Sequence, residues 1–130
     1  MQGTTPAGEV DLVRRRQIVE VFLSAARAGD LDGLLAVLDP EVVLRPDADA
    51  IRMGSSAELR GAHAVAEFLR GGARAARPAL VAGMPGLAWA PNGRVRGAIV
   101  IDIVDGRIVE IGLVANAEHL EQLDVVLLDG

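Results

Sequence analysis

Apolar residues recur at three- and four-residue spacings in three stretches of the first half of the chain, a pattern typical of helices with one buried face. The first predicted helix covers residues 11–28 and ends at Gly29, which suits a left-handed C-terminal cap. A second, shorter helix follows Asp30 and ends at Asp39-Pro40, because proline disfavours helical geometry in the residue before it. The third predicted helix covers residues 62–73.

Beyond Pro78 the pattern changes to short apolar runs separated by turn residues, which favours antiparallel strands. Asn92-Gly93 and Asp105-Gly106 are strong signals for hairpin turns. Residues 46–56 have no periodic pattern and are predicted to form a loop, and residues 117–128 a short helix or turn with an apolar tail. The predicted strands cover residues 42–44, 79–84, 87–90, 95–104 and 107–115. Three helices followed by a meandering sheet indicate an α+β domain.

Length and composition fit a single domain. The chain has 130 residues, of which 51% are hydrophobic and only 2% aromatic, so we predict one core built from Ala, Val, Leu and Ile. Residues 1–10 are predicted to form a flexible leader, because their first part is rich in Gly, Thr and Pro. Residues 11–130 are predicted to form the folded domain.

The charged residues argue against a nucleic-acid partner. The net charge is −5, and the 13 basic residues, all arginine, are spread along the chain against 18 acidic ones. A domain that binds nucleic acid normally gathers a basic excess on one face. No apolar stretch is long enough to span a membrane and the N-terminal segment is polar, so we expect a soluble, cytoplasmic protein without a membrane partner.

Cysteine and histidine usage restricts the possible chemistry. The absence of cysteine excludes disulfides, a thiolate zinc site and a cysteine nucleophile. A catalytic metal usually needs two or three imidazoles, or imidazoles together with carboxylates, and the chain has only His63 and His119. We predict no metal site and no cofactor.

Two segments contain short sequence motifs that are typical of a known protein family. Residues 21–31 read VFLSAARAGDL and residues 38–45 read LDPEVVLR. These motifs, and the predicted element order helix-helix-strand-helix-sheet, resemble the SnoaL-like (nuclear transport factor 2-like) superfamily. The resemblance implies an α+β cone fold, in which a curved antiparallel sheet packs around three N-terminal helices and encloses a pocket.

Further segments narrow the resemblance: Arg60-Gly61-Ala62, Pro85-Gly86-Leu87, Asp105-Gly106-Arg107-Ile108 and Asn116-Ala117-Glu118-His119-Leu120. Together these segments, spread over residues 14–123, resemble the C-terminal extension of extracytoplasmic-function sigma factors. The chain departs from that branch at residues 46–50, where the branch usually has a glycine-rich acidic loop, and at Ala117 and His119, where it usually has proline and lysine. The resemblance implies RNA polymerase or sigma-factor domains as partners. No promoter-recognition domain is present, and both an excised domain and a free-standing relative stay open.

The resemblance also includes SnoaL-like enzymes and ketosteroid isomerases, which move protons with a carboxylate or imidazole inside an apolar pocket. The candidates for this role are Asp47 after the first strand, His63 in the third helix and Asp102 within an apolar strand. Each has a plainer interpretation: a solvated loop carboxylate, a histidine at a helix start, and an exposed partner of Arg94 or Arg96 on the same strand face.

Four large apolar side chains are predicted to line the pocket and to contact a small apolar ligand: Phe22, Phe68, Met84 and Trp89. The chain has no tyrosine, so half of an isomerase-type oxyanion hole is missing. Two functions stay open. One is a non-catalytic domain that regulates through protein contacts or senses a ligand, and the other is a small enzyme of the polyketide cyclase, isomerase or epoxide hydrolase type. A homodimer is also predicted, because the outer face of such sheets often pairs.

Overall fold

The computed structural model describes residues 7–70 and 76–128 of the chain. These residues form helices and strands in the order α1 (Ala7–Ala28), α2 (Leu31–Val37), β1 (Leu38–Pro46), α3 (Ala48–Arg52), β2 (Leu59–Arg60), α4 (Ala62–Leu69), β3 (Ala76–Val81), β4 (Met84–Trp89), the short 3-10 helix η1 (Pro91–Gly93), β5 (Gly97–Val104), β6 (Arg107–Val114), α5 (Ala117–Leu123) and β7 (Val126–Leu127). The predicted α+β class is confirmed.

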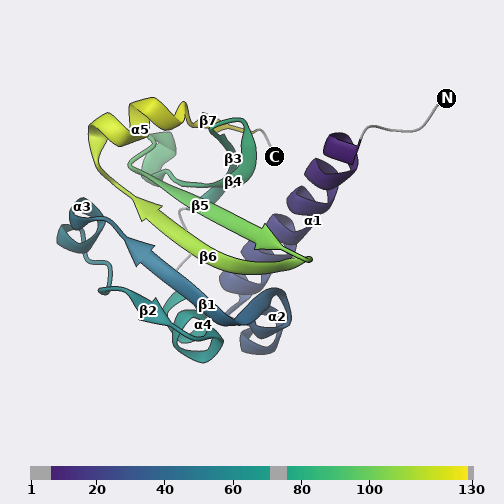
Figure 1. The fold of residues 1–130 in the computed structure, drawn as a ribbon. Coiled ribbons are helices and arrows are strands. Elements are labelled where there is room, and N and C mark those ends of the chain that lie inside the picture. Colours follow the sequence, from purple (N-terminus) through teal and green to yellow (C-terminus); the bar gives the residue numbers. More distant parts are fainter. Residues whose placement is uncertain (1–6, 71–75, 129–130) are drawn as a thin grey trace, which may run out of the picture.

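The strands form one curved open sheet in the order β2-β1-β6-β5-β4-β3-β7 (Figure 1). Neighbouring strands are antiparallel except β1 and β6, which are parallel and place Leu44 beside Ile111. The prediction of a wholly antiparallel sheet was therefore wrong at this pair. Hydrophobic alternation predicts which residues lie on one face of a strand, but it carries no information about the direction of a partner distant in sequence.

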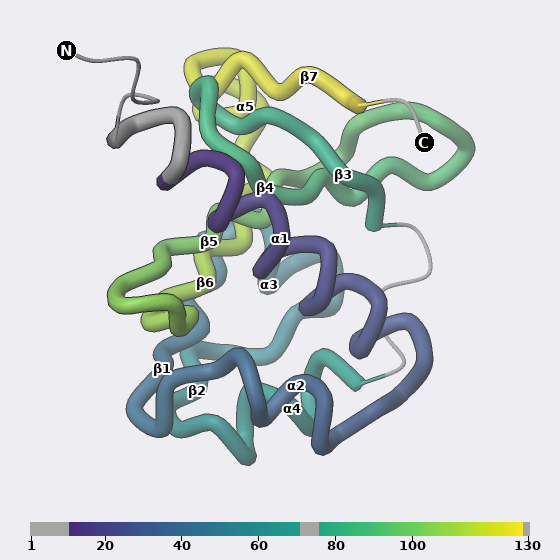
Figure 2. The backbone as a smooth tube through the Cα atoms, turned by 90° about the vertical axis from the view of Figure 1, so that its right-hand side faces the viewer, coloured from purple at the N-terminus to yellow at the C-terminus, as the bar shows by residue number. Residues whose placement is uncertain are grey.

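Helices α1, α2 and α4 cover the sheet from the concave side. α1 packs against α2 and β4, and α4 packs against β1 and α2. Figure 2 shows α1 in the foreground, with the β3–β4 end of the sheet above it and α2 and α4 below. α1 therefore packs against β4 at one end of the sheet and against α2 at the other.

Several predicted boundaries are corrected by the structure. α1 begins at Ala7, so the last four residues of the predicted leader are helical, while residues 1–6 lie outside the described part of the chain. The strand predicted at residues 42–44 is longer and begins at Leu38. The helix predicted for residues 62–73 ends at Leu69, and residues 71–75 lie outside the described part.

The segment predicted as a loop, residues 46–56, contains the five-residue helix α3. It forms because Asp47 is an N-cap: its Oδ1 accepts a hydrogen bond from the backbone N–H of Ala50 at 2.7 Å. Asp49 in the first turn and Arg52 in the last turn complement the helix dipole. The short polar segment is thus ordered by its own side chains.

The two predicted hairpin turns differ in outcome. Asp105 and Gly106 both have positive φ, 51° and 78°, and join β5 to β6 in the tight turn that the sequence predicts. Asn92 and Gly93 also have positive φ, but they lie in a longer connection that contains η1. This connection is closed by the backbone N–H of Arg96, which donates to the carbonyl of Trp89 at 2.8 Å.

The core is built mainly from aliphatic side chains, as predicted. Its largest side chains with almost no exposure are Leu34, Leu38, Val42, Leu44, Val65, Leu87, Ile108 and Ile111. A second, smaller cluster lies on the opposite face of the β3–β6 end of the sheet, where Leu120 and Leu123 of α5 pack against Ala79, Ala88 and Ala98. Both faces of that end are therefore covered by helices, α1 on one side and α5 on the other.

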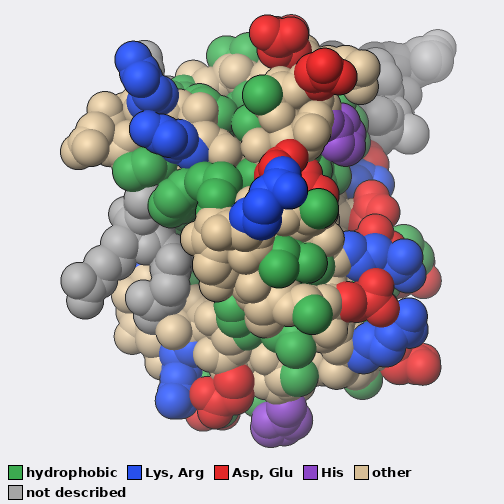
Figure 3. Space-filling view, turned by 90° about the vertical axis from the view of Figure 1, so that its left-hand side faces the viewer, with side chains coloured by type: hydrophobic (Ala, Val, Ile, Leu, Met, Phe, Trp, Pro, Cys, Tyr) green, Lys and Arg blue, Asp and Glu red, His purple; other side chains and the backbone are tan. Residues whose placement is uncertain are grey.

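Charged side chains of opposite sign pair locally on the surface. The described residues contain five ion pairs, namely Arg15–Asp11, Arg45–Glu110, Arg52–Asp49, Arg60–Glu58 and Arg70–Glu67. On the face drawn in Figure 3, most basic side chains lie beside acidic ones. Across residues 7–70 and 76–128, no helix combines the length and the apolar character that crossing a membrane requires.

Candidate functional site

An apolar cavity of about 370 Å³ lies between the helices and the concave face of the sheet. α1 contributes Phe22, α4 contributes Phe68, and α3 contributes Ala50. The sheet closes the remaining side with residues of β4, β5 and β6, among them Leu87 and Leu113. We call this space the central cavity. Its volume lies at the small end of the range for ligand pockets, roughly 300–1,000 Å³.

The lining of the central cavity has very little polar chemistry. Among the described residues, the lining has polar side-chain groups at Ser55, Arg96 and the indole N–H of Trp89, and none carries a carboxylate, an imidazole or a phenol. The Ser55 hydroxyl donates a hydrogen bond to the carbonyl of Ser56 at 3.0 Å. A general acid or base must reach the proton that it transfers, so this lining provides binding surface rather than proton transfer.

Three of the four predicted wall residues line the central cavity. Phe22 is 2% exposed and shared with the core, and Phe68 and Trp89 complete the aromatic part of the wall. Met84 lies elsewhere: it begins β4, at the opposite end of that strand from Trp89, and is 39% exposed. Met53 lines the cavity instead. Sequence reasoning missed Met53 because it treated the segment around it as a loop.

The three predicted acid–base residues lie outside the lining of the central cavity. His63 is exposed in the first turn of α4, and Asp102 is exposed on β5 opposite Glu110. Asp47 follows the end of β1, and its two carboxylate oxygens are engaged by backbone groups. The structure therefore does not bring these three side chains together around a common reacting atom.

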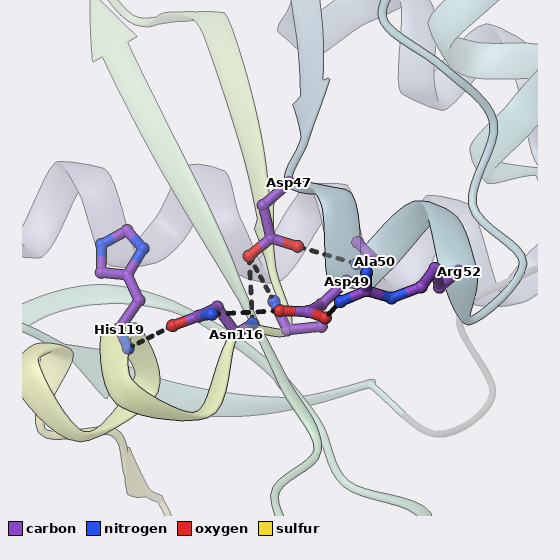
Figure 4. Close-up of polar contacts among 7 residues, drawn as sticks. Asp47, Asp49, Ala50, Arg52, Asn116 and His119 are labelled. Atoms are coloured by element: carbon purple, nitrogen blue, oxygen red, sulfur yellow. Dashed lines mark hydrogen bonds and ion pairs between the residues drawn. The ribbon is translucent and has the colours of Figure 1, made fainter.

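Asp47 connects two chain segments that are distant in sequence (Figure 4). Its Oδ1 caps α3, and its Oδ2 accepts hydrogen bonds from the backbone N–H groups of Ala115 at 2.9 Å and Asn116 at 3.1 Å. The backbone N–H of Asp47 donates to the carbonyl of Leu113 at 2.9 Å. One carboxylate thus holds the start of α3 against the connection between β6 and α5.

A second group of polar contacts extends this connection. The Asn116 side-chain amide donates to Asp49 at 3.1 Å, and its carbonyl oxygen accepts from the backbone N–H of His119 at 2.9 Å, which caps α5. Arg52 forms an ion pair with Asp49. Residues 46–50 and the segment 116–120, where the sequence departs from the sigma-factor branch, therefore contact each other. We call the contacts of Asp47, Asp49 and Asn116 the α3–α5 clamp.

The pKa of Asp47 lies below its ordinary value of 3.8. Partial burial by itself would raise this pKa, because it penalises the charged form. The hydrogen bonds from the backbone N–H groups of Ala50, Asn116 and Ala115, together with the positive field of His119, outweigh burial and lower it. A carboxylate held ionised in this way is suited to structural work and poorly suited to taking a proton near neutral pH.

The lowered pKa of Asp47 predicts a pH-dependent stability. Because the pKa is lower in the folded than in the unfolded chain, the stabilisation is complete above the unfolded-state value and is lost as pH falls through the folded-state value. Unfolding by urea at neutral and acidic pH should therefore show that the stability gap between the wild type and Asp47→Asn narrows below about pH 4. A gap that stays constant down to pH 3 would contradict this prediction.

Fold and cavity together define the class of protein. A curved open sheet packs around helices and encloses an apolar cavity, and this is the SnoaL-like (nuclear transport factor 2-like) cone fold, as the sequence predicts. No protein-family model matches the chain, and the search of curated proteins gives no match.

The extracytoplasmic function sigma factor SigJ of Mycobacterium tuberculosis is similar in structure to this chain, with 25% sequence identity and a TM-score of 0.64 over 81% of the chain. The chain spans 43% of the length of that protein. The predicted resemblance to SnoaL-like domains and to a sigma factor of this kind is thus confirmed.

Two further structures match over most of their own length. A nuclear transport factor 2-like protein of unknown function from Burkholderia pseudomallei has 19% identity and a TM-score of 0.55, covering 85% of this chain and 96% of that one. A putative polyketide cyclase from Sinorhizobium meliloti has 21% identity and a TM-score of 0.52, covering 75% and 93%. At these identities the similarity concerns the fold alone.

Proposed function

We propose that this chain is a non-catalytic SnoaL-like domain that senses a small, mainly apolar ligand and regulates a protein partner. The observation that carries the proposal is the composition of the central cavity. It is enclosed by the aromatic rings of Phe22, Phe68 and Trp89, and in the described part of the chain its lining has no group that titrates near neutral pH. Such a cavity is built to bury apolar surface.

The similarity to a sigma factor supports the regulatory part of the proposal. Of the three structures compared, SigJ has the highest TM-score and the highest identity. We infer that the natural partners are the other domains of a sigma factor or RNA polymerase, with ligand binding altering the contact. The homodimer that the sequence analysis predicts, formed through the outer face of the sheet, stays a prediction.

The competing function is a small enzyme of the cyclase, isomerase or hydrolase type. This function is compatible with the fold, because a putative polyketide cyclase has a similar structure. Against it stands the placement of its candidate residues: Asp47 is held ionised by the α3–α5 clamp, and His63 and Asp102 point to no shared cavity. An enzyme would need its acid or base inside the lining.

The proposal predicts saturable binding of a neutral apolar probe. N-phenyl-1-naphthylamine should bind in the central cavity and be detected by energy transfer from Trp89, the single tryptophan of the chain. Replacing Ala50 by phenylalanine directs a ring from α3 into the cavity, and affinity should fall at least about tenfold, which corresponds to about 1.4 kcal/mol. Fluorescence titration measures both dissociation constants.

Ala48→Phe is the matched control, since it adds the same ring to the exposed side of the same helix. It should leave the affinity unchanged. Equal losses in both variants, or no binding to the wild type, would refute the proposed ligand site. If the wild-type chain instead catalyses exchange of the α-protons of a ketone in D₂O, and Ala50→Phe abolishes this activity, the enzyme function would be favoured.

A further inference from the structure

The mouth of the central cavity combines arginine with exposed apolar side chains. Arg96 and Trp89 line both the cavity and an adjoining surface hollow, and Arg94 lines that hollow as well. Met53 also belongs to both. We call Arg94 and Arg96 the arginine rim. It lies where the apolar interior opens to solvent.

The two guanidinium groups of the arginine rim are free of acidic partners within the described part of the chain. Neither lies within 4.0 Å of a carboxylate there, whereas five other arginines form ion pairs. Neither the cavity lining nor the adjoining hollow contains an Asp or Glu among those residues. In a chain with a net charge of −5, the charged side chains of this mouth are thus both positive.

The backbone holds both arginines in place. The N–H of Arg96 donates to the carbonyl of Trp89 at 2.8 Å, next to the Trp89–Gly97 pair that joins β4 to β5. The N–H of Arg94 donates to the carbonyl of Pro91 at 3.2 Å. The backbone from which both side chains project is therefore held by a closed connection at the end of the sheet.

The apolar side chains at the same mouth are incompletely buried. Trp89 is 37% exposed and Met53 is 48% exposed, although most large apolar side chains of the described domain lie in the core. A ligand body that enters the cavity would remove their apolar surface from water, and a negative head group would meet the arginines at the rim. Both requirements are met by one molecule only if it is amphipathic.

We propose that the ligand of the central cavity is an amphipathic organic anion, with a small aromatic or aliphatic body inside the cavity and a carboxylate or similar acidic head group bound by Arg96. Arg94 adds to the positive potential from the adjoining hollow. This proposal rests on the ligand-sensing function proposed above, and it adds the chemical class of the ligand. Arginine suits this role because its planar fork binds an oxyanion with two parallel hydrogen bonds.

Two probes with the same aromatic body separate the contribution of charge. 8-Anilinonaphthalene-1-sulfonate carries an anionic group, and N-phenyl-1-naphthylamine is its neutral counterpart. The wild-type chain should bind the anionic probe more tightly, and the advantage should shrink as salt concentration rises. Arg96→Gln should weaken binding of the anionic probe about tenfold, the worth of one charge-assisted hydrogen bond, and change binding of the neutral probe much less.

Arg107→Gln is the matched control, because Arg107 is also exposed and also lacks an ion-pair partner in the described part of the chain, but begins β6, after the turn at the other end of β5. It changes the net charge equally and should not affect either probe. Arg94→Gln should weaken the anionic probe by less than Arg96→Gln. The circular dichroism spectra of the three arginine variants should match that of the wild type, because these exposed side chains do not contribute to the core.

The outcomes distinguish this proposal from the function on which it rests. If the neutral probe binds and Arg96→Gln leaves the anionic probe unaffected, the head-group assignment is wrong while the apolar ligand site stands. If Arg107→Gln weakens the anionic probe as much as Arg96→Gln, the probe is responding to net charge and the assignment is also wrong. If neither probe binds to the wild type, the ligand-sensing function itself fails.

Discussion

Replacing Leu44 by alanine is expected to lower the free energy of unfolding by about 2–5 kcal/mol, the range for deleting a buried leucine side chain. Leu44 is 0% exposed, and its parallel partner Ile111 is also fully buried. β1 lies between β2 and β6 in the sheet, and α4 packs on it. Elements held on several sides have little freedom to collapse into the cavity that the substitution leaves, so a value in the upper half of the range is expected.

Urea unfolding followed by circular dichroism measures this loss. Leu12→Ala is the matched control, because Leu12 is 38% exposed on α1 and the same atoms are removed. Its effect should stay within about 0.5 kcal/mol. A loss below 1 kcal/mol for Leu44→Ala would mean that β1 and β6 do not pack as described, and the parallel pairing would have to be reconsidered.

The second large effect is expected at Asp47. Asp47→Ala removes the cap of α3 and the shared acceptor of two backbone N–H groups, those of Ala115 and Asn116. A lost N-cap costs about 1 kcal/mol and hydrogen bonds to a charged group somewhat more each, but water can reach this half-buried site, so we expect a total of about 2–3 kcal/mol.

Asp47→Ala should also weaken binding in the central cavity, although Asp47 does not line it. α3 and the turn after it contribute Ala50 and Met53 to the wall, and the α3–α5 clamp holds α3 in position. Binding of N-phenyl-1-naphthylamine to the variant, below its unfolding temperature, measures this effect. Asp49→Ala is the control, since it loses contacts to exposed side chains worth less than about 1 kcal/mol. Equal losses in the two variants would contradict the central position of Asp47.

Much of the local structure is predictable from the pattern of the chain. The apolar spacing in residues 11–28 and 62–69 identifies the buried faces of α1 and α4, because a helix must bury one stripe to be stable. Asp105-Gly106 predicts its turn correctly, because few residues other than glycine, asparagine and aspartate accept positive φ. α3 was missed, although Asp47 followed by a short alanine-rich stretch is an N-cap signal.

The candidate site is predictable only in part. Phe22, Phe68 and Trp89 were predicted to line the pocket as large apolar side chains, and all three line the cavity. Met84 was predicted together with them, but it begins β4, is 39% exposed and does not belong to the lining. Arg96 was treated as a possible partner for Asp102, and its location at the cavity mouth is not visible in any local pattern.

The sequence by itself determined the class of the domain, the faces of its main helices, the aliphatic core and the resemblance to the SnoaL-like fold. All of these follow from residues close together in the chain. The tertiary structure alone decided the parallel pairing of β1 with β6 and the meeting of Asp47 with Ala115 and Asn116. It also decided that Arg96 and Met53 line the same surface hollow. These arrangements bring together residues far apart in sequence, and their geometry depends on how the whole sheet curves around α1.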